Sequence, residues 1–189
     1  MQTDMTVGKP MKMLLNFTIP VFLGNVFQQL YSMADAVIVG KFVGTKGLAA
    51  VGATGTITFL IIGFLMGLTT GFTVLTSQKF GAGRMDEMRK TVGNAAILSA
   101  VIAVVMTAVS MLRMHRLLVF MHTPEDIFDG AYGYIMIICA GIFTQVLYNL
   151  VSSILRALGN SKTPLYFLIL AAGLNIVLDL VFIIFFHWG

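Results

Sequence analysis

Long apolar stretches separated by short polar segments make up most of this chain. A helix that spans a bilayer needs about 20 consecutive, mainly apolar residues. The pattern predicts five such spans, at about residues 14–39, 53–78, 91–112, 128–155 and 164–186. We therefore expect an all-α, polytopic membrane protein, with sequential helices antiparallel because the connections are short.

Composition supports this class. Hydrophobic residues make up 58% of the 189 residues and charged residues only 11%, whereas about a quarter of a soluble domain is charged. Cys139 is the only cysteine, so a disulfide within one chain is impossible. The net charge of +4 comes from basic residues scattered over short connections, so we expect the lipid bilayer and no nucleic acid as a partner.

The basic residues predict the orientation of the chain. With a cytoplasmic N-terminus, eight Lys and Arg residues lie on inside segments and four on outside segments, as the positive-inside rule requires. None of them lies within a predicted span, and Arg156 is assigned to the inside turn after the fourth span. The first apolar stretch is longer than the core of a signal peptide, so we expect it to be retained.

Several local features of the spans and connections are predicted as well. Pro20 should kink the first helix, and Gly63, Gly67 and Gly71 form a GxxxGxxxG face suited to packing against another helix of the bundle. We expect a turn at residues 42–52, a short surface helix at 84–90 and an interfacial turn at 113–122. Two helix starts are expected at Thr123-Pro124 and Thr163-Pro164, the second after a stop at Gly159.

Two acids interrupt the apolar spans, Asp35 in the first and Asp179 in the fifth. A charge at membrane depth costs about 3 kcal/mol or more, so such residues usually belong to an ion or proton path. Asn175 lies one helical turn before Asp179, and Gln28 lies two turns before Asp35. By helix direction, both acids and Tyr134 of the fourth span reach the outer half of the membrane. One polar cluster drawn from these spans is therefore expected.

This cluster has a chemistry that depends on how close the acids come. Two neighbouring carboxylates in a low dielectric do not both ionise easily, so the pair can hold a proton. It can equally hold Na⁺, with the amide oxygen of Asn175 as a further ligand. A plain packing or hydrogen-bonding role remains the alternative for each residue. The spacing of His115, His122 and His187 matches no metal motif, and no hydrolase motif occurs, so we expect neither an enzyme nor a cofactor.

Several segments of the sequence together resemble a known family. They are Ile19-Pro20-Val21, the run from Gln28 to Asp35, the Gly-Ala-Gly after the second span, the run from Arg156 to Pro164, and the run from Asn175 to Asp179. Together and in this order they resemble the N-terminal lobe of a multidrug and toxic compound extrusion (MATE) transporter. The resemblance covers essentially the whole chain.

The resemblance implies that these residues are one lobe of a two-lobe transporter. Family members have twelve helices in two six-helix lobes, and they export cationic or amphiphilic compounds from the bacterial inner membrane in exchange for H⁺ or Na⁺. It implies a cation site at Asp35, Asn175 and Asp179, a supporting network at Gln28 and Tyr134, and a bend at Pro20. A sixth helix and a C-terminal lobe are not within these residues, so we expect a fragment, a truncated gene product or two chains that associate.

Two other functions remain open. A lipid-linked oligosaccharide flippase of the same superfamily is expected to present cationic residues to its cavity, which the absence of Lys and Arg from the predicted spans disfavours. A non-transporting membrane fragment or scaffold is the third possibility.

Overall fold

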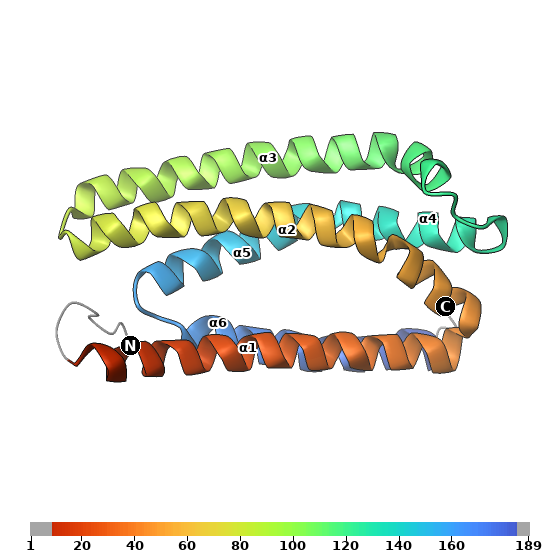
Figure 1. Ribbon diagram of the computed structural model, residues 1–189, viewed down its shortest axis with the longest axis horizontal. Helices are drawn as coiled ribbons and strands as arrows, with labels where there is room; N and C mark the ends of the chain where they lie inside the picture. Colours follow the sequence, from red (N-terminus) through yellow and green to blue (C-terminus); the bar gives the residue numbers. More distant parts are fainter. Residues whose placement is uncertain (1–8, 185–189) are drawn as a thin grey trace.

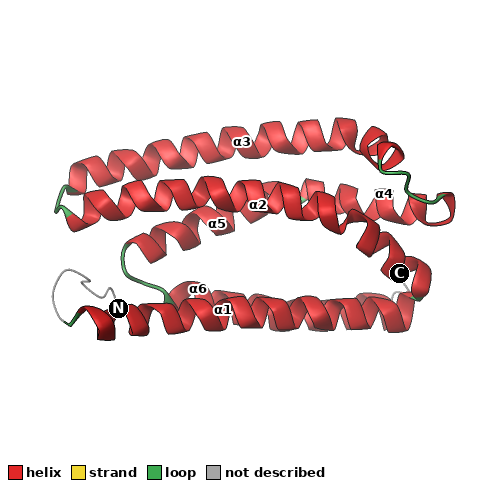
Figure 2. Cartoon of the chain, viewed as in Figure 1, coloured by secondary structure: helices red, strands yellow, loops and turns green. Residues whose placement is uncertain are grey.

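The computed structural model describes residues 9–184, which form helices joined by short connections and no strand within that range (Figures 1 and 2). The elements are α1 (Pro10–Ile38), the π-helical η1 (Val39–Val43), α2 (Thr45–Gly81), α3 (Met85–Phe120), α4 (Glu125–Ala140), α5 (Ile142–Ala157) and α6 (Lys162–Ile184). The all-α class expected from the sequence is confirmed.

The helices that could cross a membrane match the predicted spans in order. Four helices or helix runs are long and apolar enough by themselves, and α4 with α5 supplies a fifth crossing if the bent pair is one span. The two helices of that pair meet at an angle of 46°. The exact membrane boundaries stay predictions, and the last residues of the fifth predicted span, 185–186, lie outside the described residues.

The helices form two layers (Figure 1). In one layer α1 packs against α6, and in the other α2, α3, α4 and α5 contact one another. We call these the α1–α6 pair and the four-helix group. The main connections between them are η1, which contacts both α1 and α2, at one end, and the α5–α6 turn at the other.

The four-helix group contains the close-packed core. Its buried side chains come from all four helices, and the residues are Ile57, Ile61, Leu65, Ala103, Met114, Leu118, Ile135, Cys139, Ile142 and Val146. Large apolar side chains also cover the outer surface, among them Phe59 at 76% exposure and Leu112 at 80%. An apolar exterior is expected where lipid or further protein, rather than water, surrounds a helix.

Three predicted connections are wrong because the helices are longer than the bilayer requires. The chain reverses at Gly44, where φ is +95°, and α2 already begins at Thr45, so residues 42–52 are not a turn. The 36 residues of α3 would extend about 54 Å at 1.5 Å each, against a hydrocarbon core of about 30 Å. Residues 85–90 and 113–120 are therefore the ends of α3, not a surface helix and a turn.

The fourth span holds a break that the sequence analysis missed. The α4 helix ends at Ala140 and α5 begins at Ile142, with Gly141 between them. In contrast, α1 continues through Pro20 and shows no sharp kink in the view of Figure 1. The expected kink at Pro20 is therefore not seen in this conformation.

The predicted helix ends are partly right. Gly159 has a φ of +77°, as expected of a residue that stops a helix. The cap of α6 comes from Asn160, whose Oδ1 accepts a hydrogen bond from the backbone N–H of Thr163 at 3.1 Å, so the prediction of Thr163 as the cap is wrong. Likewise Pro124 precedes the first residue of α4, and no side-chain cap is formed there.

The glycine face of α2 does not pack against another helix of the described chain. Gly63, Gly67 and Gly71 are exposed, and a Cβ atom added at any of them would meet nothing within 4 Å. The expectation that this face packs inside the bundle is therefore wrong for residues 9–184.

Candidate functional site

The packing of α1 against α6 brings together the two acids that interrupt the apolar spans. Asp35 on α1 and Asp179 on α6 are both half-buried, and their carboxyl groups lie close enough to interact electrostatically. The sequence predicted a common depth for these residues and one polar cluster drawn from their spans. The structure adds that their two helices are adjacent (Figure 1).

Asn175 adds a third oxygen on the same face of α6. It lies four residues before Asp179, so the two side chains share one side of the helix. Asn175 Oδ1 and Asp179 Oδ2 are both enclosed, and neither has a hydrogen-bond partner among the described residues. Nearly all buried polar atoms in proteins are hydrogen-bonded. Two adjacent acceptors without donors therefore mark a place that can receive a positive charge.

Tyr134 approaches this group from the four-helix group. It lies on α4 within electrostatic reach of both Asp35 and Tyr31. Tyr31 is half-buried and precedes Asp35 by four residues, on the same face of α1. The sequence analysis did not assign a role to Tyr31, although this spacing was visible in it.

Gln28 and Pro20 lie nearer the N-terminal end of α1 than Asp35 does. Both line a hollow of about 60 Å³, formed with residues of α2, α5 and α6. Gln28 precedes Asp35 by seven residues, which is about 10.5 Å along a helix. The structure therefore brings Asp35, Asp179, Asn175 and Tyr134 together, while a role for Gln28 in the supporting network stays a prediction.

Arg156 is a residue whose position the sequence analysis misjudged. It lies in the last turn of α5, is half-buried, and lines two hollows between the layers. Its Nε donates a hydrogen bond to the backbone carbonyl of Ser152 at 3.2 Å. Asn149 and Ser153 share this face of α5 at helical spacing, and that polar spacing was the signal available in the sequence.

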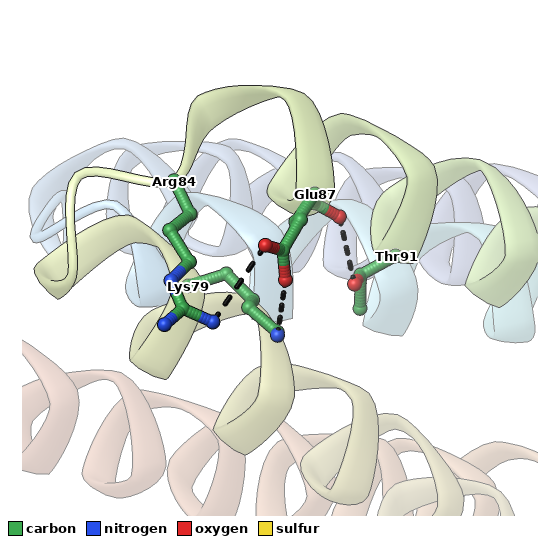
Figure 3. A network of polar contacts seen from close by, with 4 residues as sticks. All are labelled: Lys79, Arg84, Glu87 and Thr91. Carbon is green, nitrogen blue, oxygen red and sulfur yellow. Dashed lines mark hydrogen bonds and ion pairs between the residues drawn. The ribbon is translucent and has the colours of Figure 1, made fainter.

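An ion-paired network holds the connection between α2 and α3 (Figure 3). Glu87 pairs with Lys79 and, at 3.6 Å, with Arg84. Its backbone carbonyl accepts a hydrogen bond from Thr91 Oγ1 at 3.0 Å. The hydrogen bond from Lys79 holds the pKa of Glu87, which lies at the water-exposed end of α3, below its ordinary value. The network is exposed, and it fixes a connection.

The long apolar helices define a polytopic membrane protein, and acids are enclosed between two of them, α1 and α6. The family model described as MatE matches residues 20–181. The chain belongs to this family, which confirms the resemblance seen in the sequence.

Named relatives agree with this assignment. The chain is 33% identical over 186 residues to the probable multidrug resistance protein YpnP of Bacillus subtilis, covering 98% of this chain and 42% of YpnP. A solved multidrug resistance MATE family transporter in an outward-facing conformation has a TM-score of 0.91 at 30% identity, over 96% of this chain and 40% of that one. A solved MOP superfamily transporter from Pyrococcus furiosus gives the same values.

These relatives are not named as enzymes, and the chain spans about two fifths of their length. The matched part is the lobe expected from the resemblance.

Proposed function

We propose that this chain is the N-terminal lobe of a cation-coupled antiporter that exports cationic or amphiphilic drugs across a bacterial inner membrane. The observation that supports it most is the pair of enclosed, unpartnered oxygens, Asn175 Oδ1 and Asp179 Oδ2, beside the carboxyl group of Asp35. The family and the name of YpnP support drug export. The remainder of the transport path belongs to a second lobe or a second chain.

The carboxylate and amide oxygens of this site suit either H⁺ or Na⁺ as the bound cation. A proton shared by Asp35 and Asp179 turns one acceptor into a donor and removes a like-charge repulsion. Na⁺ is a hard cation, and carboxylate and amide oxygens are the ligands that hard cations prefer. Either ion gives the enclosed oxygens the positive partner that they lack among residues 9–184.

Coupling follows from where the two acids lie. Asp35 and Asp179 are on different helices, so a cation that bridges them favours the arrangement in which α1 and α6 are close. A ligand can move a conformational equilibrium only by binding its states unequally. In this proposal the cation favours one state and the drug the other, which gives alternating access across the membrane. A cytoplasmic N-terminus remains the orientation that the basic residues predict.

Asp35→Asn and Asp179→Asn test the proposal in the complete gene product that contains these residues. Each variant keeps the side-chain volume and removes the charge, so efflux of ethidium from cells should fall to the level of cells without the protein. Asp129→Asn, an exposed acid on α4, is the matched control and should export normally. Undiminished efflux in both site variants, at equal expression, would sink the assignment.

Proteoliposomes identify the coupling ion. A pH gradient and a Na⁺ gradient are imposed separately, and ethidium movement is followed in each. Transport driven by only one gradient names the ion. Equal transport without either gradient would contradict cation coupling.

A flippase remains the second candidate, and one observation now favours it. Arg156 lines two hollows between the layers, whereas the sequence analysis disfavoured a flippase because it placed no cation inside a span. Complementation of a flippase-deficient strain, without drug resistance, would favour this candidate over the exporter.

A further inference from the structure

A second polar region lies between the two layers, well away from the acids. It is a cavity of about 460 Å³ between α1, α2 and α5, a volume within the range of ligand sites in proteins, about 300 to 1,000 Å³. We call it the Arg156 cavity. Its lining residues are Phe17, Met66, Thr69, Thr70, Thr73, Ser77, Phe80, Gly81, Asn149, Ser153, Arg156, Ala157 and Gly159.

Among the described lining residues this cavity has one positive charge and no acid. Arg156 is the only Asp, Glu, Lys or Arg among its lining residues. The ion pairs found among residues 9–184 join Glu87 to Lys79 and Arg84, so none of them involves Arg156. Apart from the Nε bond to Ser152, the other N–H donors of the guanidinium have no partner seen within residues 9–184. A half-buried cation without an acid partner favours an anion beside it.

Asn149 adds a second group with spare hydrogen-bonding capacity. Its side chain is 4% exposed and lines the cavity, and its Nδ2 has no hydrogen-bond partner in the described chain. A half-turn about χ2 exchanges the two ends of the amide, so Asn149 can present an N–H donor to the cavity. It lies seven residues before Arg156, on the same face of α5.

The α2 wall has a different chemistry. The hydroxyl groups of Thr69, Thr73 and Ser77 donate to backbone carbonyls of their own helix, at 2.9 to 3.1 Å. These groups are therefore not free donors for an anion. With Phe17, Met66 and Phe80 they form a largely apolar wall opposite the donors of α5.

We propose that the Arg156 cavity binds the oxyanion group, a carboxylate or phosphate, of an amphipathic ligand. Arg156 is the counterion and Asn149 a donor, while the apolar body lies against Phe17, Met66 and Phe80. Phe17 precedes Asp35 by eighteen residues on α1, about 27 Å along the helix. The lobe thus carries an anion site separate from its paired acids, and this inference goes beyond the proposed export function.

Three matched naphthyl probes test whether the site prefers an anionic, a neutral or a cationic ligand. They are 1-naphthyl phosphate, neutral 1-naphthalenemethanol and (1-naphthylmethyl)trimethylammonium, each titrated calorimetrically into the chain in dodecyl maltoside micelles. The phosphate should bind at least tenfold more tightly than the other two. Equal affinities, or tighter binding of the cation, would overturn the proposal, and this comparison needs no variant.

Variants then assign the binding to Arg156. Arg156→Gln should weaken 1-naphthyl phosphate about tenfold or more, while Arg156→Lys should weaken it less because it keeps the charge but loses the planar fork. Arg89→Gln, an exposed cation on α3 outside the cavity, is the matched control and should change affinity less than twofold. Equal losses in Arg156→Gln and Arg89→Gln would show a general charge effect and refute the site.

Nanodiscs separate the two sources of the oxyanion. If a lipid headgroup is the ligand, phosphatidylglycerol discs should weaken probe binding relative to phosphatidylcholine discs, and Arg156→Gln should remove that difference. If the ligand is a soluble anion, the two lipids should act alike and inorganic phosphate should compete. Both outcomes require Arg156. Because binding here needs no ion gradient, it can fail or succeed independently of the Asp35 and Asp179 efflux test.

Discussion

The four-helix group and the α1–α6 pair differ in what they enclose, although both belong to one lobe. The group encloses a continuous apolar core, whereas the pair encloses two acids and meets the group across hollows lined by polar side chains. Lipid offers no hydrophobic drive between helices, so close packing must hold the group together. We infer that the group supplies rigidity and that the pair, with fewer contacts across the layers, is the part able to shift.

The largest difference between the two regions should appear on cavity formation in the core. Leu65 is 1% exposed, and Leu65→Ala should lower the free energy of unfolding by about 2 kcal/mol, near the lower end of the range for soluble proteins. The reason for the lower value is that lipid is as apolar as the core, which leaves only lost packing. Unfolding in mixed dodecyl maltoside and SDS micelles, followed by circular dichroism, measures it.

Leu60→Ala is the control for that experiment, because Leu60 is on the same helix but 65% exposed. It should change the free energy of unfolding by less than about 0.5 kcal/mol. Equal losses in the two variants would show that the four-helix group has no packed core of its own.

The turn that joins the two regions should be the next most sensitive place. Gly159 has a φ of +77°, a conformation that costs an L-residue about 1 kcal/mol. Gly159→Ala should therefore destabilise the fold by about that amount in the same unfolding assay. Gly63→Ala, inside α2 with open space around its Cβ, should not be destabilising. A loss at Gly63 as large as that at Gly159 would indicate that the glycine face of α2 packs against another molecule.

The acids of the α1–α6 pair should show a smaller effect of opposite sign. Asp179→Asn replaces one of two neighbouring like charges with a neutral amide that can donate to Asp35. At pH 8 it should raise the free energy of unfolding by about 0.5 kcal/mol, as expected for relief of like-charge repulsion at a half-buried site. Asp129→Asn should have no such effect, since Asp129 is exposed. A destabilised Asp179→Asn would mean that the carboxylate is already neutralised by a bound cation.

The sequence was sufficient for the fold class and for part of the site. Hydropathy located every long helix, and helix direction placed Asp35 and Asp179 at one depth. Helix ends were less predictable, because charged residues can extend a helix beyond the bilayer, as Met85–Phe120 shows. The break at Gly141 and the inward position of Arg156 depend on how helices pack, which hydropathy does not encode.

The smallest effect is expected at the exposed network of Glu87, outside both the core and the pair. The Lys79 hydrogen bond lowers the pKa of Glu87 in the folded protein. The contribution of Glu87 to stability is therefore present above its pKa in the unfolded chain, and it is lost as the pH falls through its pKa in the folded protein. The free energy of unfolding of the unchanged protein should therefore fall slightly between neutral and acidic pH, and Glu87→Gln should remove this decrease. The same mixed-micelle unfolding assay, run at both pH values, measures it. In 0.5 M NaCl the two proteins should become indistinguishable, because exposed pairs are screened. A difference that persists in salt would show that this connection supports the four-helix group more than its exposure implies.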